Sequence, residues 1–546
     1  MSTRPEATGG RAALALVTLV GALLGSGWLF AGAGVTNCDE WTFVHDGLRL
    51  LRGEVIYRDY FQFTPPATAW LAALGQAWLG PGVLGPRLLQ EASLLATGLL
   101  WYALARQLGA GPLGAAWPGL VLGLALHRWI PSYNHHWLVL PWLAGASLLA
   151  LRGLASGTGR AWLGAGACAA LAVLVLQSDG LVLTLALVAL LGLEAWLGEA
   201  PRRALARAGL GLGLGFGAVG LAAGGWLAAH DALGAAYRDC WVWPFAQYRT
   251  AGGFNDIPLA TDLAVQLTPF TPQLALPFGP WFYGKLLHLG GLYGLYLGGP
   301  LLGLLWGLGV LWRRWREGTR WLPTERAHAL LVLLATGLLL ATLRGRVDVI
   351  HVVGYVWPSL LLATGLAARV ARQPLPAAFA AWRPLPALAL GALLAGGVGL
   401  WLNDMRVAPQ RWGQGLRPDA LLADAEGVRW LKARVQPGDR LTAWPYAGYW
   451  GIYVAPVVGR WNHMTAPHMG YYAPAEFDRY WAGVLRDRPR FVVWAPLAPL
   501  TPALREAEWP HPLPGYRKVA TLPHRTFSLT GATLNAEIYE REGPSR

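Results

Sequence analysis

The chain has 546 residues, of which 54% are hydrophobic and only 14% charged, and its mean hydropathy is +0.36. This composition is typical of a polytopic membrane protein with at most one soluble appendage. The net charge of +14 could suggest nucleic-acid binding. However, the Lys and Arg residues fall in short clusters between apolar runs, as in cytoplasmic loops, so membrane orientation explains them and nucleic acid is excluded as a partner.

The first apolar run, at residues 12–31, follows Arg4 and Arg11. Basic residues before a membrane helix favour the cytoplasm, so we expect a retained first helix with a cytoplasmic N-terminus. Cleavage after Ala31-Gly32-Ala33 is the alternative, but the run is longer than the apolar region of a signal peptide.

Residues 36–66 then lie outside and read TNCDEWTFVHDGLRLLRGEVIYRDYFQFTPP. The segment opens with two adjacent carboxylates, Asp39 and Glu40, at a membrane face where charge is costly. Its mixture of charged and aromatic residues suits an interfacial site where a polar substrate meets a lipid-borne one. After the two prolines, residues 67–80 predict a short helix on the outer face.

The later apolar runs predict the rest of a membrane bundle. With the first run they give about eleven transmembrane helices, which places the C-terminus outside. Basic residues are more numerous in the loops that this topology assigns to the cytoplasm, which supports a multi-pass protein of the cytoplasmic (inner) membrane. The runs lie at about 83–106, 110–127, 137–152, 161–177, 180–197, 207–228, 286–312, 327–343, 349–371 and 384–403.

The least regular part of this bundle is 161–197, where Gln177-Ser178-Asp179-Gly180 interrupts the apolar pattern. Two short spans that meet at an outer turn are one interpretation, and a broken helix with polar backbone in a cavity is the other. The turn is favoured because basic residues flank both far ends, and Asp179 is then a residue of the helix turn.

Three further outer segments carry polar groups that a lipid-buried bundle does not need. One is 127–136, with the neighbouring histidines His135 and His136. Another is the loop at about 230–285, and the third is 344–351, between two spans. All three are predicted on the same side as residues 36–66.

The composition changes near residue 401, so the chain divides into a membrane domain, 1–403, and a soluble domain, 404–546. In the second domain, alternating helices and strands predict an extracytoplasmic α/β domain with a mainly parallel sheet. The expected strands lie in LTAWPY, RFVVWAP, RKVATL and AEIYE. No glycine-rich phosphate loop follows the first strand, so no nucleotide is assigned.

The order of these motifs resembles the GT-C superfamily of glycosyltransferases that use polyprenyl-phosphate sugars. The chain shares with it the Asp-Glu pair, the YRDYF motif and the two prolines after one N-terminal span, then many spans, an outer RxDxxH and a C-terminal domain. It is most similar to bacterial family-39-like proteins, relatives of protein O-mannosyltransferases and aminoarabinose transferases. The resemblance covers about residues 10–400, and it departs from some members at Thr64, where they have Lys.

The resemblance implies catalytic roles for the first-loop acids. Asp39 would act as general base on an acceptor hydroxyl, and Glu40 would orient or tune it, because the cationic, oxocarbenium-like state of glycosyl transfer needs a base and nearby negative charge. A loop start or an ion pair is the structural alternative for both acids.

The leaving lipid phosphate would need cations at the membrane face. Arg344, Arg346 and His351 of the RxDxxH motif are the candidates, with Asp348 beside them, and an Arg346–Asp348 pair that closes a turn is the alternative. In YRDYF, Tyr57, Arg58 and Asp59 are candidates for substrate binding, with Asp59 as a structural partner of Arg58 as the other interpretation.

No cofactor is required by the resemblance, although some members bind Mg²⁺ or Mn²⁺ through loop carboxylates, and Asp39 with Glu40 could supply such ligands. The His135–His136 pair is a weaker signal for zinc. Cys38 and Cys240 are both predicted outside, so a disulfide and two free thiols are both open.

The sequence therefore predicts an integral-membrane inverting glycosyltransferase of the cell envelope. Its partners would be the bilayer, a polyprenyl-phosphate sugar donor and an extracytoplasmic lipid, glycan or protein acceptor. A multi-pass secondary transporter and a non-catalytic scaffold that presents the C-terminal domain are the alternatives, although the polar residues gather at one face rather than at mid-membrane.

Overall fold

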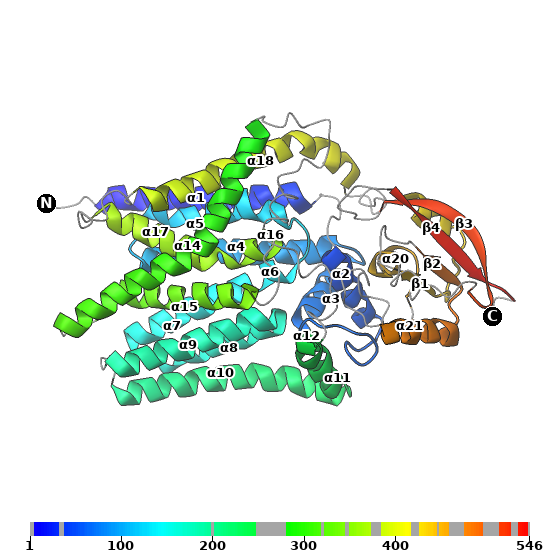
Figure 1. Ribbon diagram of the computed structural model, residues 1–546, viewed down its shortest axis with the longest axis horizontal. Coiled ribbons are helices and arrows are strands. Elements are labelled where there is room, and N and C mark those ends of the chain that lie inside the picture. Colours follow the sequence, from blue (N-terminus) through cyan, green and yellow to red (C-terminus); the bar gives the residue numbers. More distant parts are fainter. Residues whose placement is uncertain are drawn as a thin grey trace.

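The computed structural model is a long helical bundle with a small sheet beyond one of its ends (Figure 1). The helices α2, α3 and α20 lie between the bundle and the sheet, so the first-loop segment sits under the C-terminal domain. The structure describes residues 5–31, 38–197, 201–246, 280–317, 321–343, 349–372, 384–415, 425–444, 447–457, 474–494, 513–525 and 533–543.

Each apolar run of the sequence corresponds to helix. Within the described residues, seven helices are long and apolar enough to cross a membrane, and the bent pair α16–α17 makes up to eight. The expected number of about eleven spans stays a prediction. The helices of the bundle are α1 (Pro5–Ala31), α4 (Leu84–Gln107), α5 (Pro112–Val121) with the π-helical turn η1 (Leu122–Leu126), α7 (Leu140–Ser156), α8 (Gly159–Val175), α9 (Gln177–Leu197), α10 (Arg202–Ala229), α14 (Pro280–Glu317), α15 (Pro323–Leu343), α16 (Val349–Tyr355), α17 (Trp357–Val370) and α18 (Leu385–Gly415).

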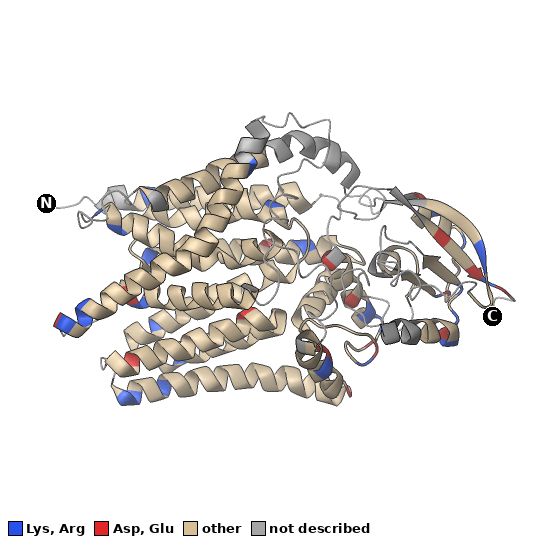
Figure 2. Ribbon diagram, in the orientation of Figure 1, with Lys and Arg blue, Asp and Glu red and all other residues tan. Residues whose placement is uncertain are grey.

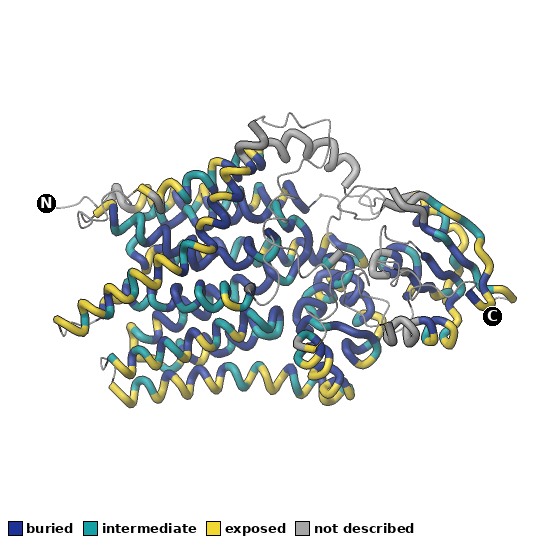
Figure 3. Tube along the Cα trace, viewed as in Figure 1, coloured by how far each residue is buried: buried dark blue, intermediate teal, exposed yellow. Residues whose placement is uncertain are grey.

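The outer surface of the bundle is apolar, as lipid contact requires. Leu210, Leu214 and Leu221 on α10 are all exposed, and exposed positions follow the length of that helix in Figure 3. A helix whose exposed positions are leucines is stable only where its surroundings are apolar, so these faces meet hydrocarbon. The protein is therefore a multi-pass membrane protein.

The interruption at 177–180 is a reversal of the chain. Helix α8 ends at Val175, Leu176 is extended, and α9 begins at Gln177 and packs beside α8 (Figure 1). This is the turn that the sequence predicted. The Gln177 side chain donates to the carbonyl of Phe63 at 3.1 Å, so the turn is tied to the first-loop segment.

The short helices at the end of the bundle next to the C-terminal sheet carry the polar segments of the sequence. Gly47 on α2 lets α3 approach closely, because a Cβ there would lie 2.6 Å from the backbone nitrogen of Ala73. These elements are α2 (Cys38–Leu51), α3 (Ala67–Leu79), the 3-10 turn η2 (His127–Trp129), α6 (His135–Leu138), α11 (Leu233–Tyr237), the π-helical turn η3 (Arg238–Val242) and α12 (Trp243–Ala246).

Many Lys and Arg residues gather at the opposite end of the bundle, away from the sheet (Figure 2). The first-loop segment, α11 and the C-terminal domain share one end, as the sequence predicted for their common side. Because Lys and Arg are enriched on the cytoplasmic side of membrane proteins, the end with the C-terminal domain is expected outside the cytoplasm.

The C-terminal sheet has four strands in the order β1-β2-β4-β3. Only β1 and β2 are parallel, whereas β4 is antiparallel to both β2 and β3. The prediction of a mainly parallel sheet was therefore wrong. Only seven residues separate β3 from β4, and a parallel crossover needs a dozen or more. The elements are α19 (Ala425–Lys432), β1 (Leu441–Trp444), α20 (Ala447–Tyr453), α21 (Pro474–Asp487), β2 (Phe491–Trp494), β3 (Tyr516–Arg525) and β4 (Thr533–Arg541).

The C-terminal domain packs directly on α2. Trp41 of α2 belongs to the same apolar core as Val428, Trp450 and Ile538. Gly451 of α20 lies against the buried His45, where a Cβ would be only 2.2 Å from the imidazole Nε2. The two parts of the chain therefore share one packed contact.

Gly451→Ala should loosen this contact. The added methyl group meets the His45 ring, and overpacking of this kind costs about 1–3 kcal/mol. We expect a lower melting temperature and faster proteolysis of the C-terminal domain, and His45→Ala in the same chain should recover part of the loss. Gly483→Ala on α21 is the control, because among the described residues the nearest atom to a Cβ there is the flexible end of Arg486, at 4.0 Å. A Gly451→Ala protein as stable as wild type would show that the contact is not tight.

Candidate functional site

A buried ion pair anchors the first-loop acids. Both guanidinium nitrogens Nε and Nη2 of Arg87 on α4 donate to the Glu40 carboxylate, at 2.6 and 2.7 Å, and both side chains are almost fully buried. Glu40 also accepts a hydrogen bond from the backbone N–H of Tyr133 at 2.9 Å. Glu40 thus fixes the segment 133–136 against α2 and α4.

Asp39 lies next to this pair and is half-buried. Its Oδ2 accepts a hydrogen bond from the side-chain amide of Asn134 at 3.1 Å. Asn134 is itself held in place, because its backbone N–H donates to Gln90 at 2.7 Å and its side-chain oxygen caps α6 at the N–H of His136. Asp39 therefore has a fixed position at the start of α2.

A row of aromatic and imidazole rings continues from Asp39 into the bundle. His135 packs edge-on against Phe43 of α2, with ring centroids 5.1 Å apart, and its ring lies 4.4 Å from that of His136. His136 in turn lies 5.1 Å from His351 and 5.8 Å from Tyr355, both on α16. The predicted acid Asp39 and the predicted phosphate ligand His351 are thus brought to one site.

Asp179 borders the inner end of this row. It is buried in the first turn of α9, and its carboxylate is within electrostatic range of His351 and Tyr355. It is a turn residue, as the sequence predicted, but it also faces the site. We call Asp39, Asn134, His135, His136, His351, Tyr355 and Asp179 the junction site.

The candidates from the YRDYF motif lie elsewhere. Asp39 and Leu51 are 12 residues apart on α2, or about 18 Å along its axis, and the motif follows the far end. Arg58 pairs with Asp59 at 2.8 Å and is largely exposed. This guanidinium, together with the N–H of Val55, holds the pKa of Asp59 below its usual value.

Tyr57 supports this turn from within. Its ring is fully buried, its hydroxyl donates to the carbonyl of Thr64 at 2.8 Å, and its φ of 70° is a strained value for tyrosine. Beside it lies a pocket of about 660 Å³ lined by Leu50, Trp70 and Trp226. Arg58 donates to the backbone of His230, which also lines this pocket.

Arg344, Arg346 and Asp348 lie outside the described residues, as does the side chain of Cys38. Cys240 is a buried free thiol that donates to the carbonyl of Thr64 at 3.4 Å, and burial raises its pKa to about 12.

Binding of Mg²⁺ or Mn²⁺ by Asp39 and Glu40 stays a prediction. Glu40 uses both oxygens to bind Arg87, and within the described part of the chain no three His, Cys, Asp or Glu side chains are grouped for a metal. Asp39 and Glu40 accordingly have different tasks.

Sequence patterns assigned no role to Arg87, Asn134 or Asp46. Arg87 could have been noticed as a lone arginine at the start of an apolar run that follows two acids. Asp46 shares a face of α2 with Asp39, seven residues away, and is fully buried. Its Oδ2 accepts a hydrogen bond from Gln62 at 2.6 Å.

Burial raises the pKa of Asp46 to about 8. The folded state therefore holds this proton more tightly than the unfolded chain, whose aspartates titrate near pH 4. The free energy of unfolding should fall as the pH rises from about 4 to about 8, by at most about 1.4 kcal/mol per pH unit.

Asp46→Asn should remove this dependence of the free energy of unfolding on pH, because the amide carries no titrating proton and its oxygen still accepts the hydrogen bond from Gln62. Melting temperatures of the detergent-purified protein, measured between pH 5 and pH 9, test this. The melting temperature of Asp46→Asn should exceed that of wild type most at the alkaline end. Asp59→Asn is the matched control, since the pKa of that carboxyl is lowered instead. Parallel pH profiles for wild type and Asp46→Asn would contradict the buried, protonated carboxyl.

A comparison with models of known protein families finds no match, and neither does a comparison with curated proteins. Among solved structures, the apo oligosaccharyltransferase of Archaeoglobus fulgidus is similar, with 13% identity and a TM-score of 0.44. That match covers 87% of this chain and 69% of the other. The mycobacterial arabinofuranosyltransferase AftD has 14% identity and a TM-score of 0.43 over all of this chain, which spans 40% of that protein. Both names are those of enzymes that transfer sugars.

Proposed function

We propose that this protein is a membrane glycosyltransferase that moves a sugar from a polyprenyl-phosphate donor to an acceptor hydroxyl outside the cytoplasm. The observation that supports it best is the position of Asp39. A half-buried carboxylate, oriented by Asn134, stands where the membrane bundle meets the C-terminal domain, beside a row of imidazoles. A lipid-borne donor and a polar acceptor could both reach this place.

Asp39 serves as the general base. One of its oxygens takes the proton of the acceptor hydroxyl as the hydroxyl oxygen forms a bond to the anomeric carbon. The bond between that carbon and the phosphate oxygen breaks, and its electron pair leaves with the polyprenyl phosphate. Attack opposite to the leaving group inverts the anomeric configuration, and the carboxylate also offsets the positive charge of the oxocarbenium-like state.

We expect the leaving phosphate to be bound by the basic residues of the RxDxxH motif. His351 reaches the junction site from α16, and Arg344 and Arg346 precede it by seven and five residues in the sequence. Protonated imidazoles and guanidiniums form strong, charge-assisted hydrogen bonds with phosphate oxygens. Tyr57, Arg58 and Asp59 follow Val55, which lines the apolar pocket at the other end of α2, and this pocket suits the lipid part of a substrate.

Glu40 is a positioning residue. Through Tyr133 it holds the segment that carries Asn134, and Asn134 orients Asp39. Its effect on the reaction is therefore exerted through the geometry of Asp39.

A secondary transporter is the second candidate, and one observation favours it. The pair α16–α17 is bent by 51°, and transporters commonly place polar side chains on such broken helices. The two functions separate in one assay. A glycosyltransferase releases free lipid phosphate from a labelled polyprenyl-phosphate sugar in detergent, where no gradient exists, whereas a transporter leaves the donor intact.

Asp39→Asn should abolish transfer without unfolding the protein. The amide can still accept the Asn134 hydrogen bond, but it can neither take the acceptor proton nor offset charge. Loss of a general base slows a reaction by about a hundred- to ten-thousand-fold. Release of labelled lipid phosphate measures the rate, and the melting temperature checks folding.

Two variants serve as controls for Asp39→Asn. Asp231→Asn makes the same change at an exposed position before α11 and should retain activity. Glu40→Gln should instead lower the melting temperature, because it leaves a buried Arg87 without its counter-charge, at a cost of about 3–5 kcal/mol. Turnover by Asp39→Asn near the wild-type rate would remove Asp39 as the base.

Arg346→Ala and His351→Ala should each weaken binding of the donor. The loss of one charge-assisted hydrogen bond corresponds to about 1–3 kcal/mol, seen as a higher KM for the donor with near-normal melting. Arg52→Ala, at the exposed end of α2, is the matched control and should leave KM unchanged. If Arg346→Ala reduced the amount of folded protein instead, the Arg346–Asp348 ion pair would be the better explanation.

A further inference from the structure

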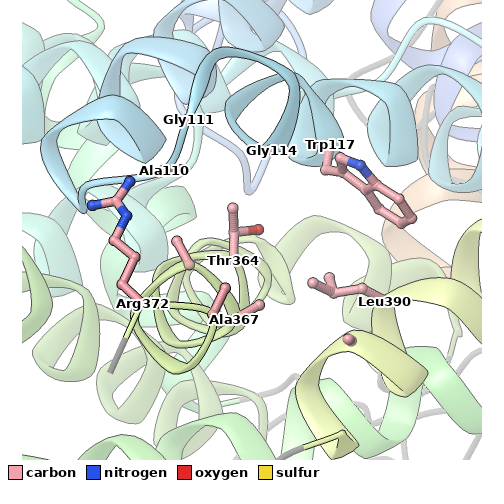
Figure 4. Close-up of a pocket in the computed structure, with 11 residues that line it drawn as sticks. Ala110, Gly111, Gly114, Trp117, Thr364, Ala367, Arg372 and Leu390 are labelled. Carbon is pink, nitrogen blue, oxygen red and sulfur yellow. The ribbon is translucent and has the colours of Figure 1, made fainter. Parts of the chain in front are cut away.

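A second site lies at the end of the bundle far from Asp39. A pocket of about 350 Å³ opens between α5, α17 and α18, and Gly111, Gly114, Trp117, Ala367, Leu390 and Arg372 are among the residues that line it (Figure 4). Its size is within the range of about 300–1,000 Å³ that is usual for ligand sites. Arg87 and Arg106 lie 19 residues apart on α4, which is about 28 Å along the axis, so this pocket is remote from the junction site.

The walls of the pocket are apolar. Glycines on α5 and alanines on α17 leave the pocket open, and Trp117 and Leu390 close its far side (Figure 4). Thr364 is the polar exception, but its hydroxyl donates to the carbonyl of Leu360 at 2.9 Å within the same helix. Its hydrogen-bond donor is thus already used, and the interior suits a hydrocarbon chain.

The edge of the pocket is strongly basic. Arg372 and Arg106 are both exposed, and they hold the two neighbouring carbonyls of the turn between α4 and α5, at Gly109 and Ala110. Among the residues that the structure describes, neither guanidinium has a carboxylate partner. Each guanidinium has five N–H donors, so both retain donors for an anion beside the apolar space.

The dimensions match one lipid chain below a headgroup. Thr364 and Arg372 are eight residues apart, or about 12 Å of helical rise, so the pocket runs from the basic edge into the hydrocarbon region. We propose that it binds an anionic phospholipid, with one acyl chain against Trp117 and Ala367 and the phosphate between Arg106 and Arg372. A zwitterionic lipid brings no net charge to compensate the two guanidiniums, so anionic headgroups are selected.

The test uses the full-length protein in detergent, titrated with dioleoylphosphatidylglycerol or dioleoylphosphatidylcholine and examined by native mass spectrometry. Wild type should bind phosphatidylglycerol more tightly than phosphatidylcholine, with one lipid bound per protein. Arg372→Gln and Arg106→Gln should each weaken it by about tenfold, the equivalent of one charge-assisted hydrogen bond, and so reduce the preference over phosphatidylcholine. Ala367→Phe fills the pocket and should weaken both lipids.

Arg160→Gln is the matched control. Arg160 is an exposed arginine at the start of α8, and α8 packs mainly against α7, α9 and α10, away from the pocket. It should bind phosphatidylglycerol as wild type does. Equal affinity of wild type for the two lipids would overturn the proposal. An Arg160→Gln loss as large as that of Arg372→Gln would also overturn it, since the effect would then be general surface charge. Melting temperatures of all variants are measured in the same detergent, and Arg372→Gln carries the test if Ala367→Phe does not fold.

Discussion

The ion pair of Glu40 and Arg87 is the interaction on which the polar end of this protein depends. Both charges are removed from water, and the desolvation of such a pair is repaid only when its geometry is good and its other hydrogen-bonding positions are filled. Here Arg87 also donates to the carbonyl of Ala31, at 3.0 Å, and Glu40 accepts from Tyr133. One contact therefore joins the end of α1, the start of α2, α4 and the segment before α6.

This arrangement divides two neighbouring carboxylates between two tasks. Consecutive residues on a helix point in directions about 100° apart, so Glu40 faces α4 while Asp39 faces Asn134. Glu40 is neutralised by the Arg87 guanidinium, whereas Asp39 accepts a hydrogen bond from the Asn134 amide. The same short sequence thus yields one acid in a buried ion pair and a neighbouring acid that faces a different partner.

The membrane helices, the short helix after the two prolines and all four C-terminal strands could be located from the sequence, because hydrophobic periodicity and length report them directly. Helix α2 was missed, because its segment was interpreted as a loop. The direction of the strands could not be predicted in this way, since it depends on the length of the connection, and only seven residues separate β3 from β4. The placement of Asp39 and His351 at the same end of the bundle was anticipated from the order of the motifs. Asn134 and Arg87 were given no role, because their roles come from contacts between residues more than forty positions apart, which no local pattern encodes.

Trp41 lies two residues after Asp39, yet it is buried in the core of the C-terminal domain with Val428 and Trp450. During synthesis, α2 leaves the ribosome long before the strands that cover it. Until those strands are made, Trp41 has no core to enter and α2 lacks its cover. The environment of the proposed base is therefore completed only after most of the chain has been translated and inserted. A stalled or truncated chain would leave Asp39 beside an uncovered aromatic surface, so the order of synthesis itself delays the formation of the site.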